Sequence, residues 1–329
     1  MLSKHPNPTL SYYFEERIRL ISNTTVVIRG LDDLITDIEP DGLFVIICRY
    51  IKSSQLKWIK KNRSALSGVA FFVDDDLASV FTSSEGSLLY RYNIARLGIW
   101  PLPRLNPLLS HVWVSTERLA KSFDSAGSQA LVLPPLPGEL PLLHDQLDPQ
   151  PTGKIKMVYH ATAIHRREHE FLVPVAAMAL NRNPNLHLEV IADGSLAKAW
   201  RQKGIAPDQL SIKPSLRWDE YLSHTSRQVA DIALVPLLEG KTNSCRSDTK
   251  RIDVARLRAA AIYSRCDIFD RCAMPDELHV ANDPNEWISA ITLLATDSVR
   301  RMASKKATHL SLEKMKSLAR PNFPFSEAR

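Results

Sequence analysis

Residues 231–264 read DIALVPLLEGKTNSCRSDTKRIDVARLRAAAIYS and place a polar segment between two apolar runs. The first run, IALVPL, is apolar up to Pro236, and a proline suits the end of a parallel strand because it has no N–H to give to the ladder. Continuous apolarity, rather than alternation, predicts a strand buried on both faces. Ligands of open parallel sheets bind beyond such strand ends. The stretch therefore predicts a binding site between two buried strands.

The polar segment carries five side chains suited to an anion that also bears hydroxyl groups: Asn243, Arg246, Ser247, Lys250 and Asp253. We expect them on a loop and on the first turns of a helix, where backbone N–H groups and cations attract phosphate oxygens. Arg246 and Lys250 are four residues apart, so on one helix both would face the same anion. Amides, cations and one carboxylate together suit a nucleotide sugar.

Similar apolar runs recur along the chain, at intervals typical of alternating strands and helices. The expected strands are TTVVIRG, GLFVIICRY, GVAFFVDD, HVWVSTE and QALVLPP in the first half, and IKMVYHA, HLEVIAD, LSIKP, IALVPL, AAIYSR and LHVAN in the second. Residues 136–151 are rich in proline, which predicts a linker. The fold class is therefore α/β, with Rossmann-like doubly wound domains at 1–135 and 152–308. A last helix at 309–329 is equally compatible with crossing back to the first domain and with packing locally.

The composition is that of a globular protein, since 44% of the 329 residues are hydrophobic and 24% are charged. The net charge of +6 is spread along the chain and accompanies no nucleic-acid-binding motif, so nucleic acid is not an expected partner. The four cysteines have no C-x-x-C spacing, which favours reduced thiols and a cytoplasmic location. No apolar run in the sequence approaches the ~20 residues of a membrane-spanning helix.

One basic cluster has two open interpretations. Lysines and one arginine interleave with apolar residues and predict a basic helix: Lys52, Lys57, Lys60, Lys61 and Arg63, with Leu56, Trp58 and Ile59. It is either a solvated helix face or a surface that approaches anionic lipids or a lipid-linked acceptor. The second interpretation would place the protein peripherally at the inner face of the cell membrane.

The stretch 231–264 resembles the donor-binding region of GT-B glycosyltransferases, especially the family 4-like group. Eight residues match that pattern: Asp231, Pro236, Leu237, Asn243, Arg246, Ser247, Lys250 and Ser264. Where this chain has Asp253, the pattern usually has Glu. A second stretch, residues 156–172 with the sequence KMVYHATAIHRREHEFL, matches another pattern of the same family at Tyr159, Thr162, His165 and Glu168. In this stretch Ala161 stands where the family has glycine. The resemblance departs at Arg258 and Ala260, where Gly and Pro are usual. The GT-B fold has two Rossmann-like domains facing a cleft.

The resemblance implies a nucleotide-sugar donor bound by the second domain, with its base against the loop KPSLRW, residues 213–218. The donor-binding residues it implies are Thr162, His165, Arg166, Gly194, Asn243, Arg246, Ser247, Lys250 and Asp253. Lys250 and Arg246 would neutralise the departing diphosphate in place of a metal ion, so we expect no essential metal and no cofactor. Two roles stay open for Asp253: binding of the ribose hydroxyls, and pairing with Lys250 on the helix.

Three consecutive aspartates, Asp74 to Asp76, end the run FFVDDDL in the first domain. Family 4-like proteins often carry aspartates at this place, facing the cleft, so Asp75 or Asp76 is the expected acceptor-hydroxyl ligand or general base. A capped helix start after the strand is at least as good an interpretation. Aspartates at a strand end also suit Mg²⁺, as in transferases of the GT-A fold, but the donor-like motifs lie in the other domain.

These features predict a glycosyltransferase that moves a sugar from a nucleotide sugar to a saccharide or lipid-linked acceptor, of the kind that builds bacterial surface polysaccharides. Retaining members of family 4 commonly carry two glutamates eight positions apart, but here Cys245 stands eight before Asp253, so the stereochemical outcome stays open. Two alternatives also stay open. One is a non-catalytic GT-B-like protein that binds sugar or a partner, and the other is a nucleotide-sugar epimerase.

Overall fold

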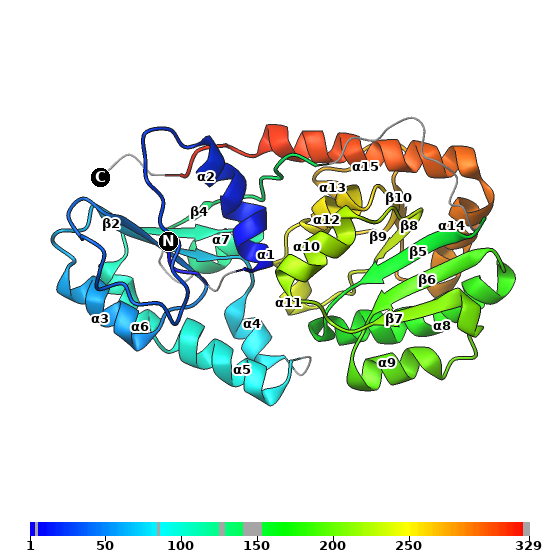
Figure 1. Cartoon of the computed structure of the whole chain (residues 1–329), viewed down its shortest axis with the longest axis horizontal. Helices are drawn as coiled ribbons and strands as arrows, with labels where there is room; N and C mark the ends of the chain where they lie inside the picture. Colours follow the sequence, from blue (N-terminus) through cyan, green and yellow to red (C-terminus); the bar gives the residue numbers. More distant parts are fainter. Residues whose placement is uncertain (4–5, 84–85, 125–128, 141–152, 325–329) are drawn as a thin grey trace. The chain divides into compact units, whose positions relative to one another are not determined.

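The computed structural model describes residues 1–3, 6–83, 86–124, 129–140 and 153–324. The chain forms two compact units and passes between them more than once (Figure 1). Unit 1 consists of Met1–Gly138, Gly240–Ser247 and Leu318–Arg329, and unit 2 consists of Glu139–Glu239 and Asp248–Ser317. Most of the expected linker, residues 141–151, lies outside the described residues.

Unit 1 contains a parallel sheet in the order β1-β2-β3-β4. Its strands are β1 (Phe44–Cys48), β2 (Gly68–Val73), β3 (His111–Val114) and β4 (Ala130–Val132). Its helices are α1 (Pro8–Leu10), α2 (Glu16–Leu20), α3 (Ser53–Lys61), α4 (Leu77–Thr82), α5 (Leu88–Ile94), α6 (Leu102–Leu105), α7 (Glu117–Asp124) and α11 (Lys241–Ser244), with a π-helical turn η1 (Ser11–Glu15) between α1 and α2, a second one, η2 (Ala95–Ile99), after α5, and a 3₁₀ turn η3 (Asn106–Leu108) after α6.

The core of unit 1 is built on β2, in which all six residues are buried. Phe72 of this strand meets the ring of Phe14 edge-on, with 5.0 Å between the ring centroids. A fully buried Phe contributes roughly 1.5–3 kcal/mol, so this contact fixes η1 over the sheet. The run TTVVIRG, predicted as a strand, is not one: it forms only a bridge from Arg29 to Leu2. Leu2 in turn bridges Ile47 of β1, so the N-terminal residues take the place beside the sheet that the predicted strand would have filled.

Unit 2 contains a parallel sheet in the order β10-β9-β8-β5-β6-β7. Its strands are β5 (Ile155–His160), β6 (Leu186–Ile191), β7 (Leu210–Lys213), β8 (Ile232–Val235), β9 (Ala260–Ser264) and β10 (Leu278–Val280). Its helices are α8 (Arg166–Arg182), α9 (Gly194–Arg201), α10 (Trp218–Ser226), α12 (Lys250–Arg256), α13 (Asp267–Asp270), α14 (Pro284–Thr296) and α15 (Ser298–Leu318), with 3₁₀ turns η4 (Ala163–His165) and η5 (Pro207–Gln209).

The strand order of unit 2 is that of doubly wound nucleotide-binding folds. From β5 the chain continues outward to β6 and β7, then returns to place β8, β9 and β10 on the other side of β5 (Figure 1). The order therefore reverses between β5 and β8. All four residues of β8 and all five of β9 are buried, as their continuous apolarity predicts.

Candidate functional site

The reversal of strand order in unit 2 fixes where a ligand site is expected, because the loops that leave β5 and β8 diverge to opposite faces of the sheet there. The loop after β8 is held by two side chains of neighbouring strand ends. The backbone N–H of Leu237 donates to Ser264 Oγ at 2.8 Å, and Asn282 Nδ2 donates to the carbonyl of Leu237 at 3.0 Å. Ser264 also donates to Asn282 Oδ1 at 2.6 Å. Two side chains thus position the end of β8 by hydrogen bonds.

Lys250 brings a cation to this edge of the sheet. It is the first residue of α12, and its Nζ donates to the carbonyl oxygen of His160, the last residue of β5, at 3.1 Å. The same ammonium lies 3.1 Å from Asp253 Oδ2. Its side chain is 38% exposed, so it can also meet an anion from solvent. The structure therefore brings Lys250 and the end of β5 together.

Asp253 is closed on both sides by cations. Its Oδ1 lies 3.0 Å from Nη1 of Arg256, while Lys250 holds its Oδ2, and the carboxylate is buried. Arg256 lies over the ring of Trp218, 5.8 Å from the ring centroid. Of the two roles open for Asp253, this geometry matches pairing with Lys250. A ribose hydroxyl could reach the carboxylate only by sharing oxygens that already accept from cations.

The residues after β5 form a tight turn that is tied to the loop after β8. The carbonyl of Thr162 accepts from the backbone N–H of His165 at 3.0 Å, which closes η4. His165 Nδ1 lies 3.8 Å from the buried carboxylate of Glu168, and Glu168 accepts from the backbone N–H of Leu238 at 3.2 Å. Glu168 belongs to the matched motif, and the structure gives it the role of joining the two loops.

Two other predicted donor residues lie on the surface of unit 2. Arg166 pairs with Glu170 one turn along α8, with 2.8 Å between Nε and Oε1, and both side chains are more than half exposed. Gly194 begins α9 after β6 with a φ of 52°, a left-handed conformation that favours glycine. Gly194 therefore makes the turn at the end of β6, as a glycine after a strand predicts.

The remaining predicted donor residues, Asn243, Arg246 and Ser247, belong to unit 1. Cys245 between them is buried in the apolar core of unit 1, and its carbonyl accepts from Thr116 Oγ1 at 3.1 Å. The hydroxyls of Ser247 and Tyr13 are hydrogen-bonded. The expectation that Arg246 and Lys250 share one helical face is wrong, because α11 ends at Ser244 and α12 begins only at Lys250.

The three aspartates after β2 all have partners within unit 1, and Asp74 and Asp75 share Arg49. Arg49, which follows β1 with a φ of 64°, places Nε 3.1 Å from Asp74 Oδ1 and Nη2 3.2 Å from Asp75 Oδ2. Thr9 Oγ1 donates to the other oxygen of Asp74 at 2.7 Å. Burial raises the pKa of Asp74 above its ordinary value, and Arg49 acts in the opposite direction.

Asp76 is the N-cap of α4. Its Oδ1 accepts from the backbone N–H of Ser79 at 3.0 Å and its Oδ2 from the hydroxyl of Ser79 at 2.5 Å. Asp76 therefore caps the start of a helix, which was one of the interpretations of the three consecutive aspartates. Arg49 was missed as a partner of these aspartates. The sequence could have indicated this contact, because Arg49 follows β1 directly and the aspartates follow β2. In a parallel sheet the ends of β1 and β2 lie at the same edge, as the pairing of Cys48 with Phe72 shows.

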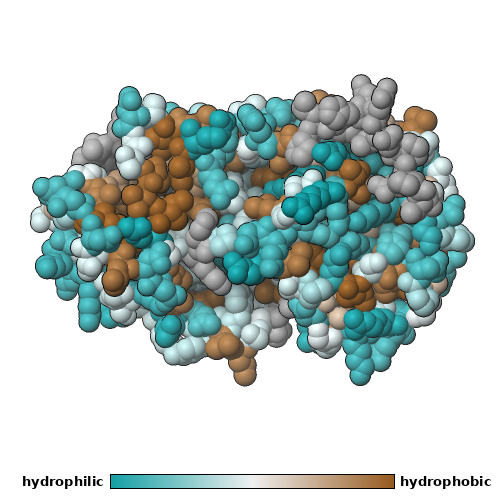
Figure 2. All heavy atoms as spheres, in the orientation of Figure 1, coloured by the Kyte–Doolittle hydropathy of each residue, from teal (hydrophilic) through white to brown (hydrophobic). Residues whose placement is uncertain are grey.

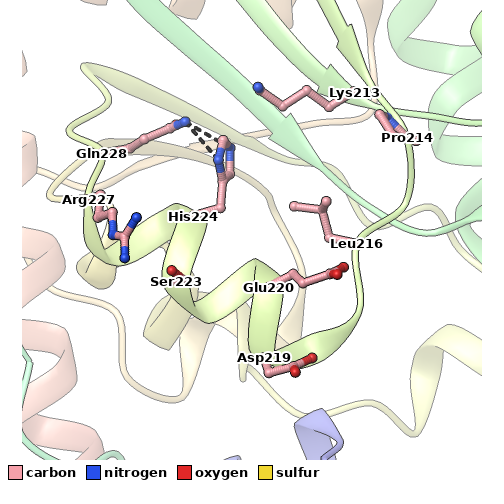
Figure 3. Close-up of a pocket in the computed structure, with 9 residues that line it drawn as sticks. All are labelled: Lys213, Pro214, Leu216, Asp219, Glu220, Ser223, His224, Arg227 and Gln228. Carbon is pink, nitrogen blue, oxygen red and sulfur yellow. Dashed lines mark hydrogen bonds between the residues drawn. The ribbon is translucent and has the colours of Figure 1, made fainter.

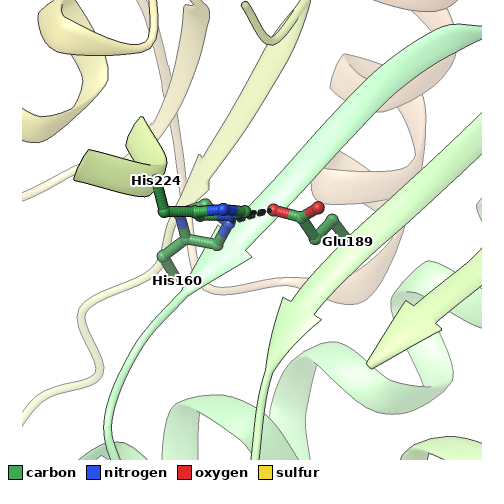
Figure 4. Close-up of side chains that lie close together, drawn as sticks. All are labelled: His160, Glu189 and His224. Atoms are coloured by element: carbon green, nitrogen blue, oxygen red, sulfur yellow. Dashed lines mark hydrogen bonds and ion pairs between the residues drawn. The ribbon is translucent and has the colours of Figure 1, made fainter. Parts of the chain in front are cut away.

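A second constellation in unit 2 was also missed: His160 of β5, Glu189 of β6 and His224 of α10 point toward one another (Figure 4). Nε2 of His160 lies 3.0 Å, and Nε2 of His224 2.9 Å, from the same oxygen, Glu189 Oε1. Lys156 Nζ lies 3.3 Å from the other oxygen. Burial raises the pKa of Glu189, but the hydrogen bonds from both histidines and the charge of Lys156 outweigh it, so the pKa lies below its ordinary range.

Two imidazoles and one carboxylate are a donor set that a Zn²⁺-like ion accepts. The fit to a metal is poor here, because the ammonium of Lys156 already balances the carboxylate and both imidazoles already face it as hydrogen-bond donors. Burial also lowers the pKa of His160, although its hydrogen bond to Glu189 acts in the opposite direction. The arrangement suits a neutral His160 fixed by Glu189 at the end of β5.

A pocket of about 590 Å³ adjoins this triad in unit 2 (Figure 3). It lies between the end of β7, at Lys213 and Pro214, and the face of α10 that carries Glu220 and His224. His224 is thus shared between the pocket and the triad. The expected base-binding loop, residues 213–218, forms part of its wall.

No model of a known protein family matches the chain, and no functionally curated protein matches it. Solved structures do. A TarM variant from S. aureus, in complex with fondaparinux, alpha-GlcNAc-glycerol and UDP, superimposes with a TM-score of 0.54 at 11% identity, covering 84% of this chain and 53% of that chain. The trehalose-6-phosphate phosphatase N-terminal domain of Candida albicans gives 0.53 at 12%, covering 86% and 69%. An alpha,alpha-trehalose-phosphate synthase (UDP-forming) from Burkholderia vietnamiensis gives 0.51 at 10%, covering 84% and 72%.

The chain spans about half of the TarM chain and about 70% of the two others. Identities this low carry the fold and not the activity, and the Candida protein shows that the fold occurs under more than one functional name. The parallel sheets of unit 1 and unit 2 agree with the fold of these structures. The resemblance seen in the sequence is therefore confirmed at the level of architecture: the chain has the GT-B fold of glycosyltransferases.

Proposed function

We propose that the protein is a Leloir glycosyltransferase, which moves a sugar from a nucleotide-sugar donor to a saccharide or lipid-linked acceptor. The observation that carries this proposal is the position of Lys250. Its partly exposed ammonium lies at the carboxyl end of β5, where the strand order of unit 2 reverses and ligands of this fold class bind. A fixed cation at that edge suits the diphosphate of a nucleotide sugar.

The proposed donor is bound by unit 2. The diphosphate would accept from Lys250 and from backbone N–H groups that follow Thr162, and the base would lie toward the 213–218 loop, which lines the pocket. Two of the similar structures support the donor class, since one holds UDP and another is named UDP-forming. Glycosyl transfer leaves negative charge on the departing diphosphate, and Lys250 would stabilise that charge without an essential metal ion.

The proposed acceptor is bound by unit 1, with Asp75 as the general base. Asp74 is ion-paired with Arg49 through Oδ1 and accepts from Thr9 through Oδ2, and both oxygens of Asp76 accept from Ser79. Asp75 contacts Arg49 through Oδ2, which orients the carboxylate and leaves Oδ1 as the oxygen best placed to take a proton.

We further propose a cytoplasmic location with peripheral contact to an anionic membrane, where a lipid-linked acceptor would be found. In the part of the chain that the structure describes, no helix is long and apolar enough to cross a membrane. We propose that the contact with the membrane is made by residues on the protein surface.

A thermal-shift panel of UDP, GDP, dTDP and CMP with their sugars tests the proposal, because a ligand that binds only the folded state raises the melting temperature. We expect a shift with one nucleoside diphosphate and its sugar, unchanged by EDTA. Turnover of that donor with an acceptor present, also insensitive to EDTA, would complete the test. A folded sample that responds to none of these ligands would refute the transferase. Turnover of the donor sugar without an acceptor would favour the epimerase.

One observation favours a non-catalytic GT-B-like protein as the second candidate. Asp253 is occupied by Lys250 and Arg256, and Asp76 by Ser79, so two expected ligand groups already have partners inside the protein. Binding of a nucleotide sugar without any turnover, across a panel of acceptors, would support this alternative.

A further inference from the structure

Four exposed apolar side chains of unit 1 lie on one short segment, which runs from α5 through η2 to Trp100. Leu88 is 81% exposed, Leu89 70%, Tyr92 50% and Trp100 55%. Leu88 and Tyr92 are one helical turn apart, and the rings of Tyr92 and Trp100 meet edge-on at 5.9 Å. Figure 2 shows hydrophobic residues projecting at the lower edge of unit 1, where Figure 1 places α5. We call these four residues the α5 apolar patch.

The charged side chains between Glu85 and Glu117, the interval that holds the α5 apolar patch, are all arginines. Residues 86–116 contain the arginines Arg91, Arg96 and Arg104 and no aspartate or glutamate. Arg96 and Arg104 are exposed, and Arg91 lies over the ring of Phe81. Leucines with a tryptophan and a tyrosine among arginines suit the headgroup region of an anionic bilayer, which accepts apolar side chains, places aromatic rings at its interface and attracts cations.

The basic helix α3 does not offer the same combination. Its Leu56 and Ile59 are buried, and Trp58 is packed against the core of unit 1, while Lys57, Lys60 and Lys61 are exposed. The helix can attract a charged surface but has no exposed apolar residue to insert. In Figure 1, α3, α6 and α5 follow one another along the lower edge of unit 1.

We propose that the α5 apolar patch inserts into the interface of a membrane that contains anionic lipids, with Arg96 and Arg104 contacting the headgroups. This inference deepens the proposed function, because it names the surface that makes the membrane contact, and it rests on that function only for the role of a lipid-linked acceptor. The occupant is a lipid surface rather than an acidic protein, because two leucines in the first turn of α5 are 81% and 70% exposed beside arginines, as in helices that lie in a membrane interface.

The test is sedimentation of the full chain with vesicles of phosphatidylcholine, with and without phosphatidylglycerol. We expect binding to the anionic vesicles that weakens with salt. L88S/L89S should weaken it at least about tenfold, because two leucines lose their apolar transfer energy. The matched control is L310S/L318S, two leucines about half exposed on α15, which should bind like the wild type.

Charge and insertion are separated by two further variants. R96Q/R104Q should reduce both the affinity and its salt dependence, whereas R182Q/R201Q, with two exposed arginines of α8 and α9, should not. Brominated lipids should quench the fluorescence of the wild type more than that of W100F, which reports insertion of that side chain.

Absence of binding to anionic vesicles, or L88S/L89S binding as tightly as the wild type, would overturn the inference. Binding lost only in K57Q/K60Q/K61Q would assign the contact to α3 instead. Each variant is checked for an unchanged melting temperature and for the nucleotide-induced shift. A variant that keeps the nucleotide shift but not the vesicle binding separates this inference from the proposed transferase activity.

Discussion

The ammonium of Lys250 lies 3.1 Å from the carbonyl oxygen of His160, so the first residue of α12 contacts the last residue of β5. The contact spans ninety residues of sequence and places a cation where a strand ends. His160 is itself held by Glu189, and Lys250 by Asp253, so the position of the cation is set by groups from three elements.

Replacing Lys250 by Gln should weaken binding of the nucleoside diphosphate by about tenfold to a hundredfold. A hydrogen bond to a charged group contributes about 1.5–3 kcal/mol, and the variant loses the charge while keeping a polar side chain. Titration followed by calorimetry measures the change. The exposed Lys203→Gln serves as a control with the same loss of charge elsewhere on unit 2. Equal affinity of both variants would exclude Lys250 from the donor site.

Asp253→Asn should destabilise the protein, because Arg256 would keep a buried charge without its carboxylate. Breaking such a pair costs roughly 3–5 kcal/mol when the remaining charge is poorly solvated. Chemical denaturation gives the free energy of unfolding. If Asp253 instead served mainly as a ribose ligand, the variant would lose nucleotide affinity with little change in stability.

The two candidate catalytic aspartates should respond differently to substitution. Asp76→Ala removes the N-cap of α4 and should lower the free energy of unfolding by about 1 kcal/mol. Asp75→Asn should lower turnover at least about a hundredfold, the usual contribution of a general base, with stability close to that of the wild type. Normal turnover in Asp75→Asn would remove that residue from catalysis.

Stability should fall as the pH drops below neutrality because of His169. Burial lowers the pKa of His169 from 6.5 to about 4, and Trp200 Nε1 donates to its Nδ1 at 3.0 Å, which requires a neutral ring. Below pH 6.5 the imidazole of His169 binds a proton in the unfolded chain, whereas in the folded chain it stays neutral down to about pH 4. The free energy of unfolding therefore decreases as the pH falls from neutrality toward 4. Between about pH 7.5 and 5 this amounts to about 2 kcal/mol. Denaturation curves of the wild type should therefore show a steeper pH dependence than those of His169→Gln. Parallel dependences would show that this histidine does not control the effect.

Much of the architecture could be predicted from the sequence, because continuous apolar runs identify buried parallel strands whatever their partners are. The expected strands from IKMVYHA to LHVAN are all present, as β5 to β10. The prediction of a strand at TTVVIRG was wrong because a strand also needs a neighbouring strand to pair with. The neighbour of this segment is only the short N-terminal segment around Leu2, with which it forms a single bridge.

The site was less predictable, because its contacts join residues that are far apart in sequence. The match around Lys250 located the cation, but spacing alone put Arg246 on the same helix, whereas α12 begins only at Lys250. His160, Glu189 and His224 come from two strands and a helix, and neither charge nor periodicity links them before the sheet order is known.

The excursion of Gly240–Ser247 into unit 1 has a consequence for how the protein can be divided. The chain crosses the boundary between the units after Gly138, Glu239, Ser247 and Ser317. A single cut after Gly138 would leave the units joined by the three other crossings. Unit 1 is then assembled from three separate lengths of chain, the last of which comes from the end of the sequence. A chain that stops before Leu318 would lack the last of these three segments of unit 1. Neither unit is therefore a contiguous fragment that could be inherited, exchanged or expressed as one piece.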